Sequence, residues 1–228
     1  MSRIPYRDTG YFSTLICDLI EQHPALEAMI ARHPSIETFA AQLEEKEAHY
    51  TEATRTELVK AIETQYANLP LSDEVSANIR LLQDKKTFTI TTGHQLNLFT
   101  GPLYFVFKIV STINLCKQLK ARYPNNNFVP IYWMATEDHD FEEISFFNFN
   151  GKKIKWSYES KGAVGRLPVD NLLSILDLFE GSIGTNSAAN KLKELIAASY
   201  RSSASLAEAT QRLVHQLFSS SGLVILDA

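Results

Sequence analysis

Four consecutive residues, Thr92-Gly93-His94-Gln95, have chemical types suited to binding an anion. They follow the β-branched and aromatic run 87–91, which is typical of a strand, and they precede a helix predicted from about 102 to 122. Ligands of open α/β sheets bind where such strands end. Gly93 permits a close backbone approach, and a helix N-terminus attracts phosphate or carboxylate. We therefore expect an anion site to which His94 donates a hydrogen bond; the alternative is a capped turn without a ligand.

The helix after this motif carries a second indication of binding. Thr100 can cap it, and Pro102 suits its first turn. Tyr104, Lys108 and Ser111 then share one helical face. A lysine on a largely apolar helix needs a partner or a ligand. Lys108 is therefore a candidate for the anion site, although extension into solvent or pairing with a structural carboxylate would also satisfy it.

A second polar motif, residues 136–143 with EDHD at 137–140, follows the apolar run 128–135. That run suits a strand covered on both faces of a parallel sheet, so the motif is expected at the same sheet edge as the first one. An imidazole, His94 or His139, could act there as acid or base near neutral pH. The cluster could also hold a divalent cation, but adjacent side chains of an extended chain point in opposite directions. A charged loop or helix cap is the remaining alternative.

The elements that carry the two motifs form a strand–helix–strand unit, which predicts an α/β fold with a parallel sheet. Helices are predicted before this unit, including one long Glu-rich helix that starts after Ser35 and ends at Asn68-Leu69-Pro70, and another capped by Ser72. A hairpin turning at 148–151, further helices and a last apolar strand follow. The expected segments are 1–84, a helical part packed on the core; 85–145, the βαβ unit; 146–221, a connecting hairpin with helices; and 222–228, a returning core strand.

Composition limits the fold class and the compartment. The 228 residues are 45% hydrophobic and 21% charged, with a net charge of −4. At about 150 residues per domain this is one large domain or one and a half, and it is too apolar for disorder. A pI near 5.9 without a basic run argues against general nucleic-acid binding. Cys17 and Cys116 lack a paired spacing, which predicts core thiols in a reducing cytosol. Without a signal peptide or a membrane-length apolar stretch, a cytoplasmic protein is expected.

Three blocks of sequence resemble one known family. The blocks 92–115, 129–144 and 217–228 are similar to the bacillithiol biosynthesis cysteine-adding enzymes, the BshC family. The resemblance implies a Rossmann-like core similar to class I aminoacyl-tRNA synthetases, with inserted segments. It also implies a ligase that adds cysteine to glucosaminyl-malate through an amide bond.

The resemblance extends to individual positions. It implies that residues 93–95 correspond to the synthetase loop that steadies nucleotide phosphates, so that ATP or ADP is a possible cofactor, while no metal ligands are assigned. The expected nucleotide-binding residues are Thr92, Gly93, His94, Gln95, Thr100, Gly101 and Lys108. The expected catalytic residues are His94, His139, Asp138 and Glu137, and the expected substrate contacts are Tyr104 and Asp140.

The chain departs from the family in length, because family members are more than twice as long. They continue with the rest of the sheet and with a coiled-coil helix that forms a homodimer. We therefore expect this polypeptide to be truncated and inactive alone. Two other functions remain open: a metal-dependent hydrolase using His94, Asp138, His139 and Asp140, and a non-catalytic module that binds nucleotide or partner chains.

Overall fold

The computed structural model describes residues 3–228, which divide into two compact units. The first unit ends at His49 and the second spans Tyr50–Ala228. In the first, α1 (Thr14–Ile20) starts after Ser13, whose hydroxyl accepts a hydrogen bond from the amide of Ile16. The expected segment boundary at residue 84 differs from this division, since the helices after Tyr50 share a unit with the sheet.

The prediction of one long Glu-rich helix is wrong. The structure has two helices there, α2 (Phe39–His49) and α3 (Glu52–Gln65). Thr51 separates them because its backbone is extended and its hydroxyl accepts a hydrogen bond from the amide of Thr54 at 3.2 Å. This is an N-cap, and it starts a new helix within a sequence whose composition is helical throughout.

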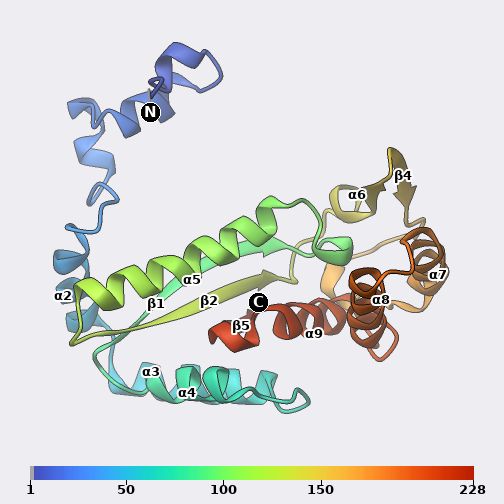
Figure 1. Cartoon of the computed structure of the whole chain (residues 1–228). Coiled ribbons are helices and arrows are strands. Elements are labelled where there is room, and N and C mark those ends of the chain that lie inside the picture. The colour runs from blue at the N-terminus through green and yellow to red at the C-terminus, as the bar shows by residue number, and fades with distance from the viewer. Residues whose placement is uncertain (1–2) are drawn as a thin grey trace. The chain divides into compact units, whose positions relative to one another are not determined.

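The second unit is built on a three-stranded parallel sheet, which confirms the predicted Rossmann-like α/β class. Its strands are β1 (Thr87–Gln95), β2 (Asn127–Ala135) and β5 (Val224–Asp227), in the order β1-β2-β5. Helix α5 (Tyr104–Arg122) connects β1 to β2 and covers one face (Figure 1). Helices α3 and α4 (Asp73–Leu81) lie on the other face, and Ser72 caps α4 as predicted.

Burial explains why these segments fold this way. Between Phe128 and Met134, the side chains of β2 are buried on both faces apart from Trp133, which is 40% exposed. On α5, buried side chains recur at three- and four-residue intervals, as expected for a helix with one apolar side facing a sheet; they include Phe105, Ile109, Ile113, Cys116 and Leu119. Cys17 and Cys116 are both buried, as predicted, and burial raises the pKa of Cys116 to about 12. No helix within residues 3–228 is long and apolar enough to cross a membrane.

The segment between β2 and β5 supplies a hairpin and helices that pack beside the end of the sheet. The elements are α6 (Phe141–Ile144), β3 (Phe146–Phe149), β4 (Lys152–Lys155), α7 (Leu173–Ser182), α8 (Ser187–Tyr200) and α9 (Leu206–Phe218). The hairpin turns at Asn150 and Gly151, both with positive φ, as a type I′ turn requires. Aromatic rings from this segment surround Phe99, which lies in the connection from β1 to α5. The inserted segment therefore holds a loop next to the first polar motif.

Candidate functional site

The first polar motif is part of a strand and not of a loop. Residues Thr92–Gln95 form the last four positions of β1 and pair in register with 132–135 of β2. Alternation along the strand sends Thr92 and His94 toward α5 and Gly93 and Gln95 to the opposite face. A Cβ at position 93 would meet Trp133 at an ordinary 3.7 Å. The packing of residues 3–228 therefore does not itself require glycine at that position.

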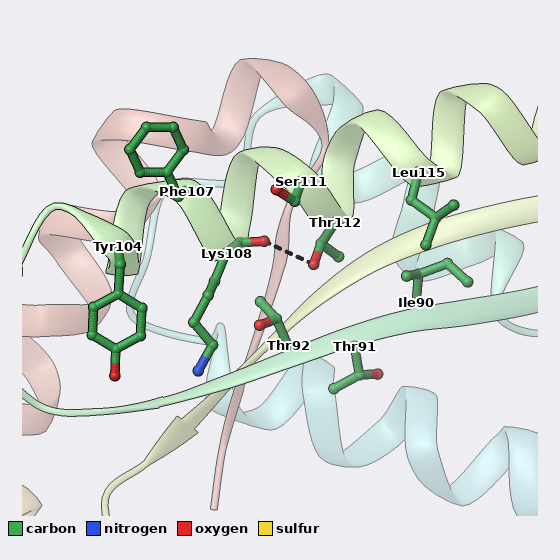
Figure 2. Close-up of a pocket in the computed structure, with 9 residues that line it drawn as sticks. All are labelled: Ile90, Thr91, Thr92, Tyr104, Phe107, Lys108, Ser111, Thr112 and Leu115. Carbon is green, nitrogen blue, oxygen red and sulfur yellow. Dashed lines mark hydrogen bonds between the residues drawn. The ribbon is translucent and has the colours of Figure 1, made fainter. Parts of the chain in front are cut away.

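Lys108 lies on α5 directly above the end of β1. Its ammonium donates a hydrogen bond to the carbonyl of Gly93 and lies 5.6 Å from the centre of the Tyr104 ring. Figure 2 shows this side chain reaching down from α5 toward the strand, in a groove of about 410 Å³. Hydroxyl groups share the groove; its lining comprises Ile90, Thr91, Thr92, Tyr104, Phe107, Lys108, Ser111, Thr112 and Leu115. The partner of Lys108 is thus a backbone carbonyl and not a structural carboxylate. The ammonium group still borders an open groove, in which a ligand could contact it.

His94 is half-buried against the first turn of α5. Its ring contacts Tyr104 edge-on, with centroids 4.9 Å apart, and lies 5.4 Å from Phe105. Its Nε2 is 3.3 Å from Nδ2 of Asn97. Burial, and secondly the positive charge of Lys108, lowers the pKa of His94. The imidazole is therefore neutral at pH 7, with one nitrogen to donate and one to accept.

The lowered pKa of His94 predicts a dependence of stability on pH. Because the folded chain disfavours the protonated ring, the unfolded chain binds the proton more readily, and stability falls as the pH drops through the ordinary histidine range near 6.5. We expect the His94 ring protons to titrate below pH 6.5 by NMR. Lys108→Met should raise that pKa because it removes the neighbouring charge. An unchanged titration in Lys108→Met would contradict the electrostatic part of this explanation.

Gln95 joins the two polar motifs. Its side-chain amide donates hydrogen bonds to Asp138 at 2.7 Å and to Glu143 at 2.8 Å. Asp138 also accepts a hydrogen bond from the backbone N–H of Asp140 at 3.0 Å. Two hydrogen bonds lower the pKa of Asp138: the larger effect comes from the N–H of Asp140 and the smaller one from the Gln95 amide. The structure therefore places the carboxylate of Asp138 at the carboxyl edge of the sheet, as the strand pattern predicted, and one amide binds both this carboxylate and that of Glu143.

The other residues of the second motif are less closely gathered. Asp140 is the N-cap of α6 and accepts a hydrogen bond from the amide of Glu143 at 3.3 Å, which corresponds to the helix-cap alternative. Glu137 and His139 are exposed. Within residues 3–228, no group of three or more His, Cys, Asp or Glu side chains is arranged to hold a metal ion. The four residues considered for a metal-dependent hydrolase are therefore not brought together.

The connection from β1 to α5 differs from the expected cap. Helix α5 begins at Tyr104, its N-cap position is Leu103, and no side chain caps it. Thr100 lies in the tight turn before it and has a positive φ, as do Phe99 and Gly101. At Gly101 a Cβ would come within 2.4 Å of the Asn97 side chain. Thr100 and Gly101 therefore shape a strained turn, and the first amides of α5 have no side-chain acceptor among the described residues.

The structure adds two residues that are not among the site residues expected from the sequence. Glu143 shares the Gln95 amide with Asp138. Asp227, at the end of β5, accepts a hydrogen bond from the hydroxyl of Thr136, and the Gln65 side chain binds its backbone. A polar residue ending an apolar parallel strand is a local signal that could have identified Asp227. Glu143 has no such signal, because its role depends on where α6 starts.

The arrangement provides two chemically different sides. An ammonium, hydroxyls and an uncapped helix N-terminus lie on the α5 side of β1. The carboxylates of Asp138 and Glu143 lie beyond the end of the strand. The first set fits the charge of a phosphate-bearing ligand such as a nucleotide, and the second fits an amine that must lose a proton.

Comparison with known proteins identifies closely similar sequences. Residues 1–228 match the family described as bacillithiol biosynthesis BshC, N-terminal Rossmann-like domain. The chain is 53% identical over 225 residues to a Flavobacterium psychrophilum protein named "Putative cysteine ligase BshC", covering 98% of this chain and 42% of the relative. Proteins of the same name from Flavobacterium johnsoniae and Cytophaga hutchinsonii are 50% and 37% identical, covering 99% and 100% of this chain. The chain spans about two fifths of the length of these relatives.

Proposed function

Because the chain belongs to the BshC family through its N-terminal Rossmann-like domain, we propose that it forms one part of the active site of a cysteine ligase in bacillithiol biosynthesis. The reaction joins cysteine to glucosaminyl-malate by forming an amide bond. The observation that supports this proposal most directly is the Gln95 amide, which links the ends of β1 and β2 through Asp138 and Glu143. The link assembles the two motifs into one site at the sheet edge where ligands of this fold class bind.

Amide formation has two requirements that the two sides of the site meet. The reacting carboxyl group must develop negative charge as the new C–N bond forms, and the α5 side offers Lys108 and His94 to stabilise it. The attacking amine must lose a proton, and Asp138, Glu137 or His139 could accept it. His94, neutral at pH 7, could also exchange a proton. Tyr104 and Asp140 are proposed to contact the substrates from the two sides.

A nucleotide, ATP or ADP, is the cofactor that we propose for this site. When bound, it would supply phosphoryl chemistry to activate a carboxylate. The residues proposed to hold it are Thr92, Gly93, His94, Gln95, Thr100, Gly101 and Lys108. The positive charge of Lys108 and the start of α5, which no side chain caps, support this assignment. Thr100 and Gly101 would contribute to the nucleotide site through the backbone shape of their turn, and not by capping α5.

We also propose the substrates, the oligomeric state and the compartment of the full-length protein. The partners are the small molecules cysteine and glucosaminyl-malate, with no nucleic acid or membrane involved. The full-length protein is proposed to be a cytoplasmic homodimer formed through a C-terminal coiled coil. The segments 85–145 and 222–228 would contribute the core strands, and 146–221 would connect them.

The proposed function is tested in the full-length polypeptide that carries this domain. His139→Ala is expected to abolish ligation of cysteine to glucosaminyl-malate, measured by mass spectrometry, because it removes an exposed imidazole beside the carboxylates. His49→Ala, a change of another exposed histidine on α2, is the matched control and should leave the rate unchanged. Unchanged product with His139→Ala would remove His139 from the mechanism. Nucleotide binding without product in the unmodified protein would favour a non-catalytic module.

A further inference from the structure

We propose that Gly165 is a positioning residue for Asp138. Because Gly165 has no side chain, the backbone around it can approach the turn that carries Asp138 and hold that turn in place. Gly165 lies in the short helical turn Val164–Arg166, which we call the strap. The strap comes from the inserted segment, well after β2 in sequence, and it lies against the residues that follow β2 directly. The proposal goes beyond the ligase function, since it concerns the placement of a carboxylate whatever reaction that carboxylate serves.

Two backbone hydrogen bonds join the strap to the acidic turn. The amide of Val164 donates to the carbonyl of Asp138 at 2.7 Å, and the amide of Gly165 donates to the carbonyl of Thr136 at 3.0 Å. Val164 and Gly165 are both buried. The acidic turn is therefore held at two points, one on each side of Glu137, by backbone donors that only a proline substitution would remove.

The approach at Gly165 leaves no room for a side chain. A Cβ at this position would lie 2.6 Å from the Cβ of Thr136 and 2.9 Å from the Thr136 carbonyl oxygen. Neither atom is the far end of a flexible side chain, so the backbone itself would have to move. Gly165 has no left-handed φ, and the requirement for glycine is therefore one of space alone.

The strap is anchored on its other side as well, so an added Cβ at Gly165 pushes the strap and the acidic turn apart. The amide of Leu206, the first residue of α9, donates to the carbonyl of Leu167 at 2.9 Å, and Pro168 forms a bridge with Ser205. Leu206 and Val164 are fully buried. Moving the turn away from this anchored strap displaces Asp138 from the Gln95 amide.

The Gln95 amide provides a readout that a general loss of stability would not reproduce. We expect Gly165→Ala to shift the NMR signals of the Gln95 side-chain amide, whose protons now bond to Asp138 and Glu143. Gln95→Met identifies those signals by removing them. Gly184→Ala is the matched control, because a Cβ there meets nothing within 4 Å. A folded Gly165→Ala protein with unshifted Gln95 amide signals would overturn the proposal.

A second measurement decides the proposal even if Gly165→Ala does not fold. Hydrogen exchange on the unmodified chain should show the amides of Val164 and Gly165 protected, with each exchanging at least about tenfold more slowly than in an unstructured peptide. Exchange of both amides at the unstructured rate would show that the strap does not hold the turn. Neither readout depends on ligation, so failure of the proposed function would leave this result intact.

Discussion

Tyr200→Ala is expected to lower the free energy of unfolding of this chain by about 3–5 kcal/mol, which is the usual cost of removing a large buried aromatic ring. Tyr200 is 1% exposed, and its ring lies 5.1 Å from that of Phe99. Its hydroxyl accepts a hydrogen bond from the amide of Phe99 at 3.0 Å. The substitution would leave a cavity and a partly buried donor, the Phe99 amide, without its acceptor. Urea denaturation followed by circular dichroism measures the difference.

A milder substitution at the same position separates the two contributions. Tyr200→Phe keeps the ring and removes only the hydroxyl, so the expected loss is about 1 kcal/mol. Because Phe99 has a left-handed backbone, its amide depends on this acceptor to stay in place. If both variants were equally stable, the packing of Tyr200 against Phe99 would contribute nothing, contrary to the burial observed.

Gln95→Met should reduce ligation by the full-length protein about 100-fold, the scale seen when one positioned hydrogen-bond donor is lost from an active site. Methionine has a similar size but no N–H group, so Asp138 and Glu143 lose their shared donor. The pKa of Asp138 should rise toward its ordinary value, because the Gln95 amide is one of the groups that lower it. Carboxyl carbon NMR and an initial-rate assay test the two parts separately.

Gln83→Met provides the control for this substitution. Gln83 is exposed, beyond α4, and its replacement should change neither the rate nor the titration of Asp138. A raised pKa without a slower reaction would mean that the amide orders the carboxylates but is not needed for turnover. An unchanged pKa of Asp138 would contradict the hydrogen-bonded geometry itself.

The sheet and the helix that crosses it could be predicted from sequence because their signals are local. The apolar run of β2 and the spacing of buried residues on α5 follow directly from burial. The same reasoning placed both polar motifs at one edge, since parallel strands end together. The resemblance supplied the family, which the comparisons confirm.

Features that depend on contacts between distant residues could not be predicted. Thr51 separates two helices, although the residues at 44–48 and 52–53 are Glu, Lys and Ala, which favour helix. The pairing of Gln95 with Glu143 depends on the start of α6, and the need for glycine at 165 depends on the approach of a strap from another part of the chain. The sequence also suggested that Thr100 caps α5, but the turn there uses left-handed backbone instead.

The order of strands along the chain also matters while the protein is being synthesised. The βαβ unit is complete once Ala135 has left the ribosome, but β5 pairs with β2 only after Val224 has emerged. At a synthesis rate of roughly 5–20 residues per second, the apolar edge of β2 stays unpaired for several seconds before β5 is available. Because β2 is an apolar strand with an open edge during that interval, it is exposed to aggregation while the rest of the chain is synthesised.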